Sequence, residues 1–305
     1  MRLLRGAWRL LVAIKDGLAL LVLLLFFGAL FAILSARPNP AIAHSGALLF
    51  DLNGSIVEQP TQPAPLSLLA GSGRSEAREY RLRDLIRAAE TAAGDNRVKA
   101  AVLDLDGFSG GGQAAIDEFG RAIDEIRKAG KPVLAFATAY NDDSYALASH
   151  ASEIWLNPMG AVLLTGPGST HLYYKGLLDK LGIDVRVYRG GQFKSAAEPF
   201  TRTDQSPAAK LAAQALVDSL WTSWRQTVGA VRPQAQIDNY VANLAARFTA
   251  AGGDLARAAA QAGLIDRLGN RYSFCRRVAA LVGADPARGP GGSTVLRLRR
   301  WLAAP

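Results

Sequence analysis

The sequence has very few of the side chains that build disulfide frameworks or metal sites. Its 305 residues include one cysteine, Cys275, and three histidines, His44, His150 and His171. A single cysteine excludes a disulfide within the chain, because that bond needs two. The histidines lie too far apart in the sequence for the usual ligand spacing of a metal site. We therefore predict that the chain uses no metal and no cofactor.

The sequence also lacks an excess of basic residues outside its two ends. The formal net charge is +9. Residues 1–37 contain five basic side chains and one acidic one, and residues 275–305 contain six arginines and one aspartate. These two ends carry the whole excess, so residues 38–274 are neutral on balance. A nucleic-acid-binding protein concentrates basic residues on its folded body. We therefore expect no nucleic-acid partner.

One long hydrophobic run lies near the N-terminus. The 18 residues from Gly17 to Leu34 contain no charged side chain, and a helix of this length can cross a hydrocarbon core of about 30 Å. Four basic residues precede the run, whereas only Arg37 follows closely. This asymmetry predicts a cytoplasmic N-terminus and an extracytoplasmic main domain. We expect a basic N-terminus at 1–16, a transmembrane anchor at 17–36 and a neck at 37–45.

A cleaved signal peptide is the alternative to this anchor. Two short segments, 35–37 and 41–43, resemble weak cleavage sites. The apolar run is longer than the usual core of a signal peptide, which favours an uncleaved anchor. The mass of the membrane-bound protein distinguishes the two.

Between residues 46 and 206, strand-like and helix-like segments alternate. Such alternation predicts parallel strands joined by right-handed crossovers, and therefore a layered α/β domain. Expected strands lie at 46–52, 98–105, 133–138, 153–156, 162–164 and 183–188, and expected helices at 80–93, 116–126, 142–150 and 172–181. A loop rich in proline, glycine and serine is expected at 58–74, and a glycine-rich turn at 107–112.

The remainder of the chain differs in pattern. Residues 207–285 read as a helical extension, with helices at 208–230, 234–246, 255–262 and 272–282. Residues 286–305 are rich in glycine, proline and arginine, and we expect a poorly ordered tail there.

The stretch GGQFKSAAEPF, residues 190–200, holds the main candidate for chemistry. Lys194 lies there among apolar and small residues. A poorly hydrated lysine favours its neutral amine, which can accept a proton from a serine hydroxyl. The alternative is a solvated surface lysine beside a loop, and spacing alone favours that alternative.

Together these segments resemble the first half of the long form of the signal peptide peptidase A family. These are membrane-anchored serine peptidases with a ClpP/crotonase-like fold. The resemblance is carried by the arginine-flanked anchor, by GGQFKSAAEPFTRTDQSP (190–207), and by VKAAVLDLDGFSGGG (98–112), AGKPV (129–133), SYALASHASEIWLNPMG (144–160) and GLIDRLG (263–269). It implies a layered β/α spiral, here followed by the helical region and preceded by the transmembrane helix.

The resemblance also implies a mechanism. In that family a serine nucleophile and a lysine general base form a dyad, with the lysine in the first half and the serine in the second. Lys194 stands at the position of the base. The corresponding glycine turn in this half places Phe108 where the nucleophile would stand, with Ser109 one position later. The segment Gly289–Ser293 is only a superficial likeness of the serine motif. We therefore expect this chain to lack the nucleophile and to be inactive alone, as a fragment, a truncated product or one subunit.

Three functional hypotheses follow. The first is the base-bearing half of a serine endopeptidase in the bacterial inner membrane, single-pass, cleaving membrane-released peptides such as signal peptides. Its partner is a second-half domain that supplies the serine, or another copy of the chain in a homo-oligomer. The second is a non-catalytic membrane-anchored scaffold of the same fold. The third, an acyl-CoA enzyme of the crotonase type, conflicts with the extracytoplasmic topology, because CoA thioesters are cytoplasmic.

Overall fold

The computed structural model describes residues 2–35, 45–61, 78–168, 170–188, 190–191, 193–285, 292–298 and 301. These belong to two compact units, Met1–Ile42 and Ala43–Pro305. Nearly all of the expected neck at 37–45, and most of the expected loop at 58–74, lie outside the described residues.

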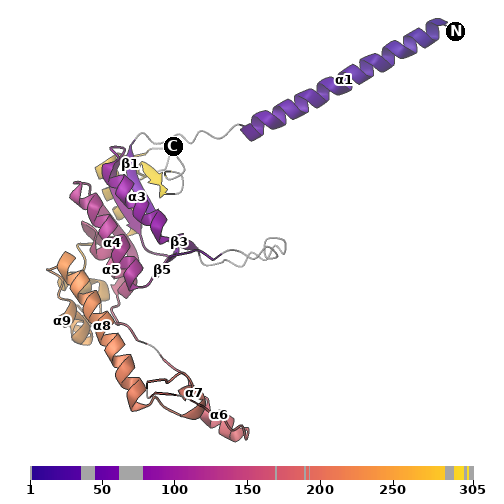
Figure 1. Cartoon of the computed structure of the whole chain (residues 1–305). Coiled ribbons are helices and arrows are strands. Elements are labelled where there is room, and N and C mark those ends of the chain that lie inside the picture. Colours follow the sequence, from indigo (N-terminus) through magenta and orange to yellow (C-terminus); the bar gives the residue numbers. More distant parts are fainter. Residues whose placement is uncertain are drawn as a thin grey trace. The chain divides into compact units, whose positions relative to one another are not determined.

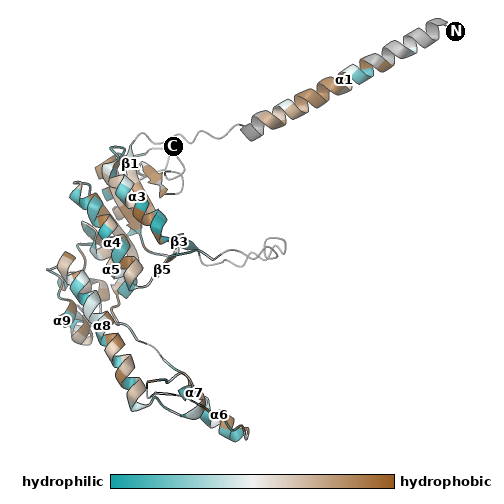
Figure 2. Ribbon diagram, in the orientation of Figure 1, coloured by the Kyte–Doolittle hydropathy of each residue, from teal (hydrophilic) through white to brown (hydrophobic). Residues whose placement is uncertain are grey.

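The first unit contains one long helix, α1 (Arg2–Ser35). Its window from Ile14 to Phe31 has a mean hydropathy of 2.2, which is apolar enough to cross a membrane by length and composition. Hydrophobic residues predominate along this stretch in Figure 2. The helix expected from the sequence is therefore present, and it begins well before the apolar run.

The second unit is built on two parallel sheets (Figure 1). The larger sheet has the strand order β8-β7-β6-β4-β1-β9, and the smaller has the order β3-β2-β5. Every paired strand in both sheets runs parallel to its neighbour, which confirms the layered α/β class. The strands are β1 (Gly46–Asp51), β2 (Gly54–Val57), β3 (Glu79–Arg81), β4 (Val98–Asp104), β5 (Phe108–Gly110), β6 (Val133–Tyr140), β7 (Glu153–Val162), β8 (Arg267–Leu268) and β9 (Val295–Arg297).

The larger sheet is buried on both faces, as expected for parallel strands. Successive side chains of a strand point to opposite faces. On β1, Leu48 and Phe50 join the core cluster that contains the apolar sides of α3 (Leu82–Gly94) and α4 (Gln113–Lys128). Ala47 of the same strand joins a second cluster with Phe274.

The helices after residue 206 are α8 (Pro207–Val231), α9 (Ile237–Ala242), α10 (Leu244–Ala250), α11 (Leu255–Gln261) and α12 (Arg271–Val282). Two of them, α11 and α12, pack back onto this sheet. α11 contacts β7, and α12 contacts β4. Residues 43–305 form one compact unit.

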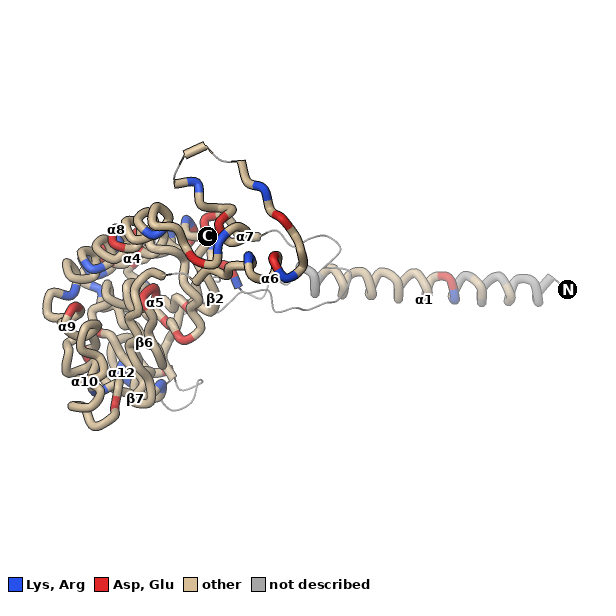
Figure 3. The backbone as a smooth tube through the Cα atoms, turned by 90° about the horizontal axis from the view of Figure 1, so that it is seen from below, with Lys and Arg blue, Asp and Glu red and all other residues tan. Residues whose placement is uncertain are grey.

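A projecting segment, residues 170–206, separates the sheet from α8, and we call it the arm. It contains α6 (Lys175–Lys180) and α7 (Glu198–Thr201), and it extends away from the sheet in Figures 1 and 3. The prediction of a strand at 183–188 is wrong, because these residues form no regular secondary structure. Within the part of the chain that the structure describes, no strand pairs with these alternating apolar residues. The expected helix at 172–181 is shortened to α6.

Other expected elements need smaller corrections. In place of the two short strands expected at 153–156 and 162–164, one strand, β7, runs from Glu153 to Val162, and its pairing with β6 is irregular between Ala137 and Ala139. The helix expected at 234–246 is divided into α9 and α10 at Asn243. Part of the tail expected to be poorly ordered forms β9, which pairs with β1.

Candidate functional site

The arm carries Lys194 between a glycine turn and a short helix. Gly191 has a φ of +101°, a backbone conformation that residues with a Cβ rarely adopt. The turn therefore needs glycine and redirects the chain just before Lys194. Lys194 itself is exposed in this chain, and Ser195 is half-buried. Among the described residues, Lys194 is therefore exposed rather than enclosed in the apolar pocket that its role as a base would require.

A buried carboxylate fixes the helix that follows Lys194. Glu198, the first residue of α7, is 3% exposed. Its carboxylate accepts hydrogen bonds from the Ser206 backbone N–H at 3.0 Å and from the Ser206 Oγ–H at 2.5 Å. Ser206 Oγ in turn accepts from the Ala209 N–H at 3.2 Å and so caps α8. The segment after Lys194 is thereby tied to the start of α8.

Tyr174, the residue just before α6, joins the two helices of the arm by its contacts with α7. The Tyr174 N–H donates to the Pro199 carbonyl oxygen at 2.6 Å. The rings of Tyr174 and Phe200 stack with centroids 5.8 Å apart. Many other large apolar side chains of the arm are exposed: Leu172, Leu177, Leu181, Ile183, Val187, Tyr188 and Phe193. The arm is therefore ordered within itself but presents an unusually apolar surface.

The glycine-rich turn lies away from the arm, beside the sheet (Figure 1). Phe108, for which the resemblance predicts the position of the nucleophile, is 7% exposed and belongs to the main core cluster. Ser109 is exposed. The Gly111 N–H donates to Asp143 Oδ2 at 3.2 Å, so a carboxylate of this chain occupies a donor that an oxyanion would use in a catalytic copy of the turn.

A hollow of about 280 Å³ adjoins this turn where α5 (Asp142–Ser149) meets α8. Its lining includes Gln113, Asp142, Asp143, Leu220, Trp221 and Trp224. Sequence analysis missed this site. The only available signals were two adjacent aspartates at the start of a helix and a Trp-x-x-Trp pair on another helix, and neither pattern is specific.

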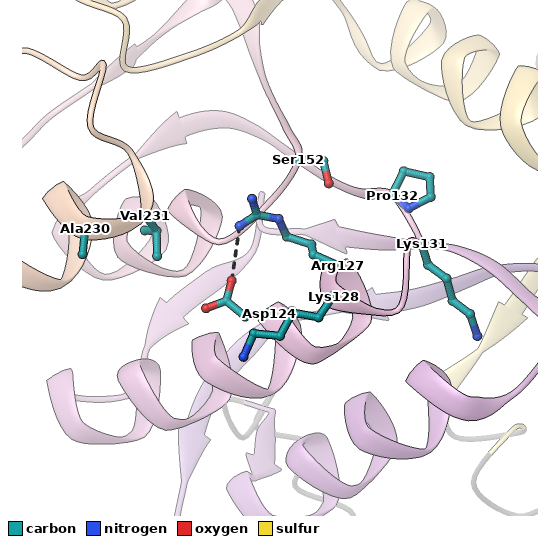
Figure 4. A pocket seen from close by; sticks show the side chains of 9 residues that line it. Asp124, Arg127, Lys128, Lys131, Pro132, Ser152, Ala230 and Val231 are labelled. Carbon is teal, nitrogen blue, oxygen red and sulfur yellow. Dashed lines mark hydrogen bonds and ion pairs between the residues drawn. The ribbon is translucent and has the colours of Figure 1, made fainter.

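A second, more open hollow of about 670 Å³ lies at the end of α4 (Figure 4). Its basic side chains are already engaged. Arg127 Nη1 lies 3.2 Å from Asp124 Oδ1, and Lys128 Nζ lies 2.7 Å from Glu125 Oε1. Lys131 Nζ donates to two backbone carbonyls at 2.7 Å, and burial lowers its pKa. The basic side chains of this hollow therefore have a structural role, because they bind carboxylates and backbone carbonyls of the chain itself.

The histidines and the cysteine form no metal site within the described part of the chain, where no three His, Cys, Asp or Glu side chains gather closely enough to hold an ion. His150 is 2% exposed, with its Nδ1 2.8 Å from Asp124 Oδ2. It serves as a core residue that links α4 to the end of α5.

Comparison with known proteins gives matches over most of the chain. The model of the family described as Peptidase family S49 matches residues 125–285. Protease 4 of Salmonella typhi is 36% identical over 278 residues, which cover 87% of this chain and 44% of the relative. Protease 4 of Haemophilus influenzae is 33% identical, covering 92% of this chain and 47% of the relative. The chain thus spans less than half the length of these curated relatives.

Solved structures give weaker similarity. The 1510-N membrane-bound stomatin-specific protease in complex with a substrate peptide matches with a TM-score of 0.35 and 12% identity, over 76% of this chain and 80% of that chain. An enoyl-CoA hydratase/isomerase family protein from Silicibacter pomeroyi matches with a TM-score of 0.29 and 16% identity, over 82% and 84% of the two chains. These similarities are too low to place individual residues.

Proposed function

Because the chain belongs to peptidase family S49, we propose that it is the base-bearing half of a membrane-anchored serine peptidase. In this proposal Lys194 is the general base, and a second domain supplies the serine nucleophile. The observation that carries the proposal is the combination of Lys194 and an exposed apolar surface on one ordered arm. The glycine turn supports it, because a buried phenylalanine stands there in place of a nucleophile.

The exposed arm is the feature that needs a partner. Large apolar side chains on both sides of Lys194, including Leu181 and Phe193, remain in contact with water in this chain. Burying such surface stabilises an interface by roughly 25 cal/mol for each Å² removed from water. We propose that the arm packs against the domain that carries the serine. That domain belongs either to the same longer protein or to a neighbouring subunit.

Docking of the arm would also prepare the base. A lysine acts as a base only as the neutral amine, and removal of water favours that form over the ammonium. The amine then takes the proton of the serine hydroxyl as its oxygen attacks the peptide carbonyl. The resulting ammonium gives the proton to the departing amine of the peptide. Water hydrolyses the acyl-enzyme, with the same lysine as base.

The proposed location follows from α1. The N-terminal basic residues and the apolar window from Ile14 to Phe31 support a single-pass anchor with a cytoplasmic N-terminus. The anchor would then lie in the inner membrane of a bacterium, and the main domain would lie outside the cytoplasm. Peptides released within that membrane, such as signal peptides, are the proposed substrates.

The test is reconstitution with the missing domain. The full chain in detergent micelles is combined with a second-half domain that contains the family's serine nucleophile, and hydrolysis of a fluorogenic peptide is measured. Replacing the base, Lys194→Ala, is expected to lower the rate about 10²- to 10⁴-fold. The matched control is Lys128→Ala, which removes an exposed lysine of α4, outside the arm, and should leave the rate unchanged.

Equal rates for the two variants would remove the base role from Lys194. That result would favour the alternative, a non-catalytic scaffold of the same fold. Co-sedimentation of the two domains, measured on the same samples, shows whether the arm still binds its partner when the lysine is absent.

A further inference from the structure

The hollow between α5 and α8 is a candidate for binding rather than catalysis. Trp221 and Trp224 stack in its wall, with ring centroids 5.0 Å apart and planes 13° from parallel. The Trp224 indole N–H donates to the Asp142 carbonyl oxygen at 3.0 Å, which ties α8 to the start of α5. The hollow therefore has rigid walls, one of them aromatic.

Two carboxylates complete this lining. Asp142 and Asp143 are half-buried neighbours at the first turn of α5, where the positive end of the helix dipole favours negative charge. Asp142 accepts hydrogen bonds from Thr165 and from the Gly166 N–H, at 3.0–3.2 Å. Asp143 accepts from the Gly111 N–H.

All of these donors are neutral. Among the described residues, neither carboxylate has a lysine, arginine or histidine within ion-pair distance. The hollow thus combines two carboxylates that have no ion-pair partner among the described residues with an aromatic wall, where Arg225 of this chain already lies 5.9 Å from the Trp221 ring centroid. This combination suits a cation carried on an apolar stem, because the stem contacts the rings while the charge reaches the carboxylates.

An inorganic cation fits this lining less well. The described part of the chain offers no group of three metal-ligating side chains there, whereas a protein calcium site takes six to eight oxygen ligands. A lysine or arginine side chain needs only an apolar channel and one or two carboxylates.

The position of the hollow also points to a peptide. Through Asp143 it adjoins the turn of Gly110 and Gly111, which corresponds to the nucleophile turn of the family's second half. In this chain Phe108 of that turn is buried in the core, and Asp143 accepts the hydrogen bond of the Gly111 N–H.

We propose that this hollow is a non-catalytic subsite that binds a lysine or arginine side chain of a peptide. The proposal rests on the proposed function, since it takes a peptide as the ligand, and it adds a preference for cationic substrates. Signal peptides carry a positively charged N-terminal region, so this preference matches the proposed substrate class.

The test measures binding by the full chain in detergent micelles, without the second domain. The probe is a fluorescein-labelled nonapeptide of Ala, Ser and Gly with one central lysine. The matched peptide has norleucine, which keeps the stem and removes the charge. Fluorescence anisotropy is expected to give a Kd about tenfold lower for the lysine peptide, and salt above about 0.5 M should narrow the difference. Equal Kd values for the two peptides would overturn the proposal.

Variants locate the binding. Asp142→Asn and Asp143→Asn remove the negative charge while each keeps one acceptor oxygen, and each should weaken binding of the lysine peptide several-fold without affecting the norleucine peptide. The control Glu118→Gln removes an exposed carboxylate of α4, outside the hollow, and should change neither. A loss as large in Glu118→Gln would mean non-specific attraction and would sink the proposal.

Two further measurements keep the outcomes distinct. Circular dichroism checks that each variant is folded, and the peptide comparison on the unmodified chain needs no variant at all. MgCl₂ should displace the lysine peptide no more than NaCl of equal ionic strength, and stronger displacement would indicate an inorganic-cation site instead. Failure here leaves the Lys194 experiment unaffected, because hydrolysis by the reconstituted peptidase is read separately.

Discussion

At the scale of single residues, two helical glycines show how tightly the core of this chain is packed. A Cβ added at Gly120 in α4 would lie 2.4 Å from His150 Nε2 and 2.5 Å from its Cδ2. The ring cannot move away easily, because it is buried and bonded to Asp124. At Gly229 in α8, an added Cβ meets nothing within 4 Å.

The two positions therefore predict opposite effects of the same substitution. Gly120→Ala should lower the free energy of unfolding by about 1–3 kcal/mol, because the extra methyl overpacks the core. Gly229→Ala should raise it by about 0.5–1 kcal/mol, because alanine favours the helix. Urea unfolding of the full chain in micelles measures both. If both variants are stabilised equally, the contact of His150 with Gly120 is not as close as described.

At this scale, the sequence allows prediction of candidate residues whose motif lies within a few neighbouring positions. Lys194 was identifiable because the whole motif lies within eleven neighbouring residues. The contact between Asp143 and Gly111 spans 32 residues, and no local pattern shows which carboxylate reaches which turn. The exposure of Lys194 in this chain agrees with the surface lysine that spacing alone favoured, whereas the way in which the arm packs is not visible in a local pattern.

At the scale of elements, one buried link joins α7 to α8. Glu198 accepts two hydrogen bonds from Ser206, and Ser206 caps α8. Because Lys194 lies just before α7, this link also holds the backbone that carries the proposed base. Glu198 is therefore a positioning residue, and its effect should appear as local opening of the arm.

We expect Glu198→Ala to increase amide hydrogen exchange across residues 193–206 by tenfold or more, since a hydrogen bond to a charged group contributes about 1.5–3 kcal/mol. Ser206→Ala should act in the same way. In a double-mutant cycle, the free energies of local opening should be non-additive by about 1 kcal/mol or more. Additive effects would show that the two side chains act independently, and exchange in α4 serves as the internal control.

Strands were predictable where a segment has a clear hydrophobic pattern of its own and a neighbouring strand to pair with. The strands at 46–52, 98–105 and 133–138 are apolar runs flanked by turn residues, and they form β1, β4 and β6. Residues 183–188 alternate as a strand does, yet they lie on the arm without a strand beside them. The last strand, β9, was missed because its three residues gain their structure from the edge of β1.

At the scale of the whole molecule, the sheet, both core clusters and the arm belong to residues 43–305. The apolar window of α1 buries none of its residues within the structure. A helix with this composition finds its favourable environment in hydrocarbon rather than in a protein core. Folding of the second unit and attachment to a membrane should therefore be separable properties.

We accordingly predict that a chain shortened to residues 45–305 folds without α1. Its melting temperature by circular dichroism should lie within about 2 °C of the full chain, because a change of about 1 kcal/mol would already shift it by more. After cell lysis and ultracentrifugation, the full chain should pellet with membranes and the shortened chain should not. As a matched control, Leu21→Arg and Leu24→Arg together place two charges within the span of the full chain, each costing about 2.5–3.5 kcal/mol at the centre of a membrane helix. This variant should also leave the membrane fraction while keeping the melting temperature. A shortened chain that is unfolded, or that still pellets with membranes, would show that α1 contributes to the fold or that another surface binds the membrane.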